Sequence, residues 1–124
     1  MNITLWIITV ILALLFLAAG SMKLAQPKAK LAAAGQGWVE DFSDDTVKRI
    51  GTVEILGAVG LILPALLNIA TFLVPAAATG LALLMAGSAI THARRNEKPN
   101  VIINIVLGIL AAGVAVARFG PFSF

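Results

Sequence analysis

Residues 47–67 read VKRIGTVEILGAVGLILPALL, an apolar run with one acidic side chain, Glu54, in its interior. The run is about 20 residues long, the length that an α-helix needs to cross a hydrocarbon core of roughly 30 Å. A carboxylate at membrane depth costs about 2.5–3.5 kcal/mol on insertion scales, so an acidic residue there indicates a functional site by default. The stretch therefore predicts a membrane-spanning helix that carries a polar site.

Three further apolar stretches have a similar length, at residues 3–24, 69–91 and 101–119. The chain of 124 residues is 60% hydrophobic and 12% charged, with a mean hydropathy of +0.99, whereas soluble domains carry about 25% charged residues. Short connections make successive helices antiparallel neighbours. We therefore expect one all-α domain, residues 1–124, folded as an up-down bundle of four membrane-spanning helices. Pro75 lies inside the third of them and should kink it.

The longest polar stretch, residues 26–45, follows the first predicted helix. Its second half alternates apolar and acidic residues, which is typical of an amphipathic segment that lies in the membrane interface, with Trp38 as its anchor. Ser43 or Asp44 suits the N-cap of the next helix. The first loop is therefore predicted to contain an interfacial amphipathic segment.

Basic side chains gather in the first and third connections and at the helix ends beside them: Lys23, Lys28, Lys30, Lys48, Arg49, Arg94, Arg95 and Lys98. Positively charged loops stay in the cytoplasm. We therefore expect an integral protein of the cell membrane with loops one and three in the cytoplasm and both termini outside. The net charge of +3 then reflects this asymmetry and an attraction to membrane lipids, and no nucleic-acid-binding patch is predicted.

Cysteine is absent and histidine occurs once, at position 92. Without cysteine, the chain can form no disulfide, thiolate nucleophile or iron–sulfur cluster. One His and one Glu on different helices make a poor metal site. We therefore predict no bound metal.

Each predicted helix carries polar residues in its cytoplasmic half. They are Ser21 and Lys23 on the first helix, Glu54 on the second, Ser88 and His92 on the third, and Asn104 on the fourth. Glu54 lies roughly 10 Å inside the membrane at 1.5 Å per residue. Gly51 lies on the same face of the helix, so that a ligand or another backbone can approach the carboxylate. This convergence predicts an intramembrane polar pocket.

Within this pocket we predict that Glu54 and His92 act as acid–base residues. The ligand-binding residues are predicted to be Lys23, Ser88, Asn104, Gly51 and Ser21. A structural interpretation stays open for each charged group. Glu54 would then only hold helices together through Asn104 or Ser88, Lys23 would extend to the membrane interface, and His92 would cap its helix.

Three segments resemble the DoxX-like membrane proteins: FLAAGSMKL at 16–24, RIGTVEILGAVGLILP at 49–64 and MAGSAITH at 85–92. The resemblance implies a four-helix integral membrane protein. It also implies that Glu54 occupies the family's acidic position on the second helix, and that Lys23 and His92 match its polar positions on the first and third. The family is named after a subunit of a thiosulfate:quinone oxidoreductase, and some members associate with redox enzymes.

Three classes of function follow from these observations. In the first, the bundle binds a lipophilic small molecule such as a quinone and serves as an accessory to a redox enzyme subunit, with no cofactor other than a quinone as ligand. In the second, the chain is a cofactor-free membrane enzyme that uses Glu54 for isomerisation or epoxide opening. In the third, it is a scaffold without a ligand. Transport is a weaker alternative, because four helices enclose little pore unless the chain forms a homo-oligomer.

Overall fold

The computed structural model describes residues 2–26, 28–33 and 42–123. Its helices are α1, Asn2–Ala25; α2, Lys28–Ala33; α3, Asp44–Leu67; α4, Leu73–Arg94; and α5, Lys98–Phe119. The described part of the chain is all-α, as predicted. Four of these helices, α1, α3, α4 and α5, are long and apolar enough to cross a membrane, which confirms the predicted number of membrane spans.

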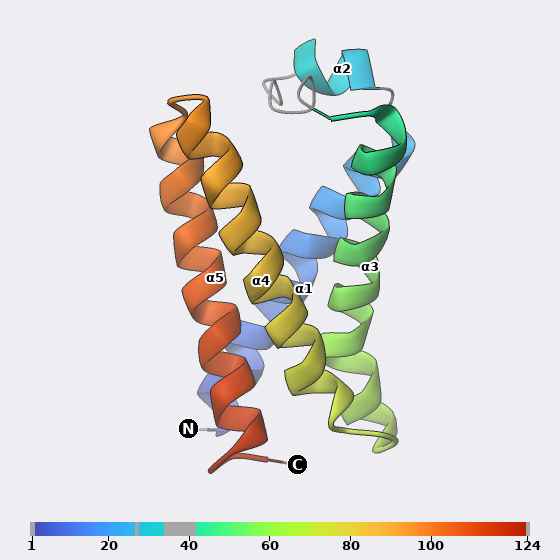
Figure 1. Cartoon of the computed structure of the whole chain (residues 1–124). Helices are drawn as coiled ribbons and strands as arrows, with labels where there is room; N and C mark the ends of the chain where they lie inside the picture. The colour runs from blue at the N-terminus through green and yellow to red at the C-terminus, as the bar shows by residue number, and fades with distance from the viewer. Residues whose placement is uncertain (1, 27, 34–41, 124) are drawn as a thin grey trace.

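Successive long helices run antiparallel, which confirms the up-down bundle (Figure 1). α1 packs mainly on α3, and α4 packs mainly on α5, while a smaller contact between α3 and α4 joins the two pairs. The termini lie at one end of the bundle, and α2 and the turn between α4 and α5 lie at the other, which we call the basic end. The two pairs approach each other near the termini and diverge towards the basic end (Figure 1).

The bundle surface is apolar over most of its length. Large aliphatic side chains are more than half exposed on α1, α4 and α5, among them Leu14, Leu83 and Ile109. Soluble proteins rarely expose such a continuous apolar surface, whereas acyl chains solvate it in a bilayer. Most of the interior is also apolar and includes the fully buried Leu12, Phe16, Leu61, Leu81 and Val114.

Two glycines bring α1 and α3 into backbone contact. A Cβ added to Gly20 would lie 2.6 Å from the carbonyl oxygen of Gly51, and one added to Gly51 would lie 2.9 Å from the carbonyl oxygen of Gly20. Real Cβ atoms do not approach backbone atoms so closely, so only glycine allows this crossing. The same crossing brings the Cβ of Lys23 next to Gly51.

The turn between α3 and α4 corrects one sequence prediction. Asn68 (φ 52°) and Ala70 (φ 47°) adopt left-handed conformations, which end α3, and α4 begins at Leu73 rather than at the predicted Ile69. Pro75 therefore lies in the first turn of α4, where its missing N–H removes no internal helix bond. The prediction of a kink caused by Pro75 inside the helix is wrong.

The start of α3 follows the predicted capping. The Ser43 hydroxyl accepts a hydrogen bond from the backbone N–H of Thr46 at 3.1 Å, so Ser43 is the N-cap. Trp38 and the rest of residues 34–41 lie outside the described residues. The interfacial amphipathic segment therefore stays a prediction.

A buried arginine ties the two ends of the chain together at the end opposite the basic end. Arg118 is only 4% exposed. Its Nη1 donates to the side-chain oxygen of Asn2 at 2.7 Å and to the backbone oxygen of Phe122 at 2.9 Å. These bonds link the start of α1 to the end of α5.

Candidate functional site

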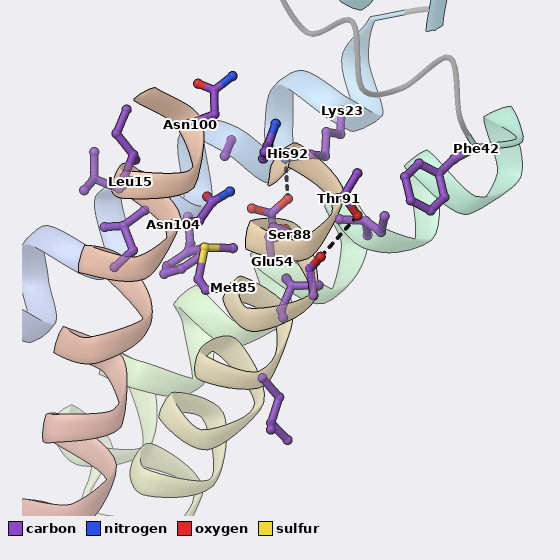
Figure 2. A pocket seen from close by; sticks show the side chains of 18 residues that line it. Leu15, Lys23, Phe42, Glu54, Met85, Ser88, Thr91, His92, Asn100 and Asn104 are labelled. Carbon is purple, nitrogen blue, oxygen red and sulfur yellow. Dashed lines mark hydrogen bonds and ion pairs between the residues drawn. The ribbon is translucent and has the colours of Figure 1, made fainter. Parts of the chain in front are cut away.

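A cavity of about 600 Å³ lies between the two helix pairs towards the basic end (Figure 2). All four long helices contribute to its walls. Its volume falls within the range of about 300–1,000 Å³ that is typical of small-molecule sites. Most of the predicted site residues line it: Lys23, Glu54, Ser88, His92 and Asn104.

A buried ion pair spans the cavity wall between α1 and α3. Lys23 Nζ lies 2.6 Å from Glu54 Oε1, and the two side chains are 14% and 3% exposed (Figure 2). The sequence interpretation of Lys23 as a residue that extends to the membrane interface is therefore wrong. The contact between Gly20 and Gly51 brings the two helices so close that the ammonium group reaches the carboxylate.

The same pair replaces the partners that the sequence suggested for Glu54. Under the structural interpretation, Glu54 would bond to Asn104 or Ser88, but both lie on the opposite helix pair across the cavity. Arg49 is exposed and pairs with Asp45 at 3.6 Å on the surface of α3. The buried charge of Glu54 is thus matched from α1.

Lys48 holds the end of α1 against α3. Its Nζ donates to the backbone oxygens of Lys23 at 2.6 Å, Gln26 at 2.7 Å and Leu24 at 3.3 Å. The last carbonyl groups of a helix have no hydrogen-bond donor within the helix and carry partial negative charge. A lysine ammonium group there donates hydrogen bonds to them and offsets this charge. The sequence pattern indicates Lys48 only as part of the charge asymmetry between the loops. Its contact depends on the helix packing, which no spacing in the sequence indicates.

His92 closes the cavity near the turn between α4 and α5. Its Nδ1 lies 2.8 Å from Glu97 Oε1, and its side chain is 11% exposed. Its backbone oxygen accepts from the N–H groups of Arg95 and Glu97. Glu97, which the sequence reasoning missed, is thus the acidic partner seen for His92, whereas Glu54 pairs with Lys23.

Asn104 presents a buried donor to the cavity. Its Nδ2 is buried and has no hydrogen-bond partner among the residues that the structure describes. An amide N–H without a partner costs about 1–3 kcal/mol when buried. Because Asn104 lines the cavity (Figure 2), a ligand with an acceptor oxygen would remove this cost.

The remaining predicted site residues lie outside the cavity lining. Ser21 is exposed on α1, and Gly51 forms the contact with Gly20 that packs α1 on α3. Thr91 and Asn100 line the cavity although sequence reasoning missed them. Across residues 2–26, 28–33 and 42–123, no group of three His, Cys, Asp or Glu side chains is arranged to hold a metal ion.

Fold and site together define a four-helix integral membrane protein with a buried ion pair beside an intramembrane cavity. The model of the DoxX-like family matches residues 7–114. The chain therefore belongs to the DoxX-like family, which confirms the resemblance found in its sequence. No curated protein and no solved structure matches the chain.

Proposed function

We propose that this protein binds a lipophilic small molecule with a quinone-like head in its intramembrane cavity. The observation that carries the proposal is the buried Nδ2 of Asn104, which faces the cavity and lacks a partner in the described structure. A carbonyl oxygen of the ligand accepts a hydrogen bond from this group. The nearby Lys23–Glu54 pair supplies a second polar contact for the head.

The rest of the cavity suits the apolar part of such a ligand. Apolar side chains from α1, α4 and α5 form its walls, among them Phe16, Leu84, Met85 and Leu107. Burying apolar ligand surface against them supplies affinity, while a few placed polar groups set the orientation of the ligand. As an accessory protein, the chain would hold the ligand for a redox enzyme in the same membrane.

Ligand binding is tested with decylubiquinone and the purified protein in detergent micelles, by native mass spectrometry. We expect saturable binding. Asn104→Leu should weaken the affinity about tenfold, because the lost hydrogen bond contributes about 1–1.5 kcal/mol net to binding. Ile105→Leu is the matched control, since Ile105 is an exposed neighbour on the same helix. Unchanged affinity in Asn104→Leu, or no saturable binding by the wild-type protein, would contradict the proposal.

Glu54 supports a second candidate, a cofactor-free enzyme that performs acid–base chemistry on an apolar substrate. Its carboxylate lines the cavity beside an ammonium group, so that a proton donor and a proton acceptor lie together. Turnover of an apolar epoxide or isomerisable lipid by the purified chain, without an electron acceptor, would favour this candidate. Loss of that turnover in Glu54→Gln would assign the chemistry to the carboxylate.

The proposed sidedness places the basic end in the cytoplasm and the termini outside. Because the chain has no cysteine, single cysteines introduced at the exposed Ala33 and Ser123 report their own location. In intact cells, a membrane-impermeant maleimide should label Ser123→Cys, whereas Ala33→Cys should be labelled only after permeabilisation. The reverse pattern would show the opposite orientation.

A further inference from the structure

The contact between α3 and α4 ends before the basic end. Nearer the termini the helices touch closely, since a Cβ added to Gly57 would lie 2.7 Å from Leu81 and one added to Gly60 would lie 3.0 Å from Ala77. The same antiparallel register places Ile50 opposite Ser88, two turns closer to the basic end. Ile50 and Ser88 both line the cavity. The two helices therefore diverge at this level, and the cavity extends between them.

The α4 edge of this gap faces outward. Leu83 lines the cavity and is 70% exposed. Gly87, one turn further along α4, also lines the cavity and is exposed, and a Cβ added there would meet nothing within 4 Å. A residue that lines a cavity and is also exposed on the bundle surface marks a place where the cavity opens.

The depth of this edge places the opening within the hydrocarbon region. Measured from Arg94 at the end of α4, Gly87 lies about 10 Å and Leu83 about 16 Å along the helix axis at 1.5 Å per residue. The hydrocarbon core is about 30 Å thick. The opening therefore faces acyl chains rather than water.

We propose that the gap between α3 and α4 at Leu83 and Gly87 is a lateral entrance through which a membrane-dissolved amphiphile reaches the cavity. The inference rests on the proposed ligand-binding function. The polar head of the amphiphile lies beside Lys23, Glu54 and Asn104, and its tail leaves the cavity between α3 and α4. Such a ligand partitions from the bilayer into the site without crossing water. Glycine at position 87 keeps the entrance clear.

The test uses a cysteine inside the cavity as a reporter of access. Ser88→Cys is nearly isosteric and is the only thiol, because the native chain has none. The variant is reconstituted in phosphatidylcholine vesicles and treated either with N-dodecylmaleimide, which dissolves in the bilayer, or with a sulfonated maleimide that stays in water. We expect N-dodecylmaleimide to label the thiol much faster than the charged reagent.

Blocking the entrance should slow this labelling. Gly87→Trp in the Ser88→Cys chain should lower the rate of N-dodecylmaleimide labelling about tenfold, which corresponds to a rise of about 1.4 kcal/mol in the barrier to entry. Leu83→Trp is a second block at the same edge. Gly80→Trp is the matched control, because Gly80 is also an exposed α4 glycine with nothing within 4 Å of an added Cβ and is absent from the cavity lining. It should leave the rate unchanged.

The outcomes separate this inference from the proposed function. Equal labelling by the two reagents would show access from water and overturn the entrance. Unchanged rates of N-dodecylmaleimide labelling in both Gly87→Trp and Leu83→Trp would also overturn it, provided that both variants keep the helicity and the thermal unfolding of the parent chain. Decylubiquinone binding in micelles is measured independently of this route. If decylubiquinone fails to bind but N-dodecylmaleimide still labels the thiol faster than the charged reagent, the proposed ligand is rejected and the entrance stays supported.

Discussion

Replacing Lys23 by Met is expected to lower the free energy of unfolding by about 3–5 kcal/mol, the usual cost of breaking a buried ion pair from one side. Lys23 is the cation seen against the Glu54 carboxylate, at 2.6 Å, and that carboxylate is 3% exposed. Methionine keeps the length of the lysine stem but removes its charge. The measurement is unfolding of the purified protein by SDS in mixed micelles, followed by circular dichroism.

Two controls identify the pair as the cause. The double variant Lys23→Met/Glu54→Met should recover most of the lost stability, because apolar replacement of both partners of a buried pair is often neutral. Arg49→Met removes the exposed pair with Asp45 and should change stability by less than about 1 kcal/mol. A double variant that is no more stable than the less stable of the two single variants would contradict a direct interaction between the two charges.

A second large effect is expected at the crossing of α1 and α3. Gly20→Ala should lower the free energy of unfolding by about 1–3 kcal/mol, the usual range for overpacking. The new methyl group would lie 2.6 Å from the backbone oxygen of Gly51 and 2.8 Å from the Ile55 side chain. Backbone cannot yield as a flexible side chain can, so the helices must move apart. SDS unfolding of the purified protein measures this cost.

The matched control for Gly20→Ala is a glycine on another helix, and its expected effect on stability has the opposite sign. Gly113 lies inside α5, is exposed, and has nothing within 4 Å of an added Cβ. Gly113→Ala should therefore raise stability by about 0.5–1 kcal/mol, because alanine loses less backbone entropy than glycine in a helix. Equal effects of Gly20→Ala and Gly113→Ala would show that helix propensity, and not the close crossing, governs position 20.

The site was partly predictable from the sequence. Helix orientation and depth brought Glu54, His92 and Asn104 to the same end of the bundle, and the structure places all three around one cavity. Partners were harder to predict, because hydrogen bonds and ion pairs depend on which helix faces meet. Lys48 illustrates the difficulty: its side chain reaches carbonyl groups 22 to 25 residues earlier in the chain.

The amino-acid sequence alone determined the four membrane-spanning helices, because hydropathy and length are properties of each segment by itself. It also indicated Glu54 as a candidate functional residue, since a carboxylate in an apolar membrane helix is costly wherever that helix packs. Only the tertiary structure decided that Lys23 neutralises Glu54 and that an open cavity lies beside them. The physical reason is that both features depend on distances between helices, which the glycine contact between α1 and α3 shortens and the divergence of α3 from α4 lengthens.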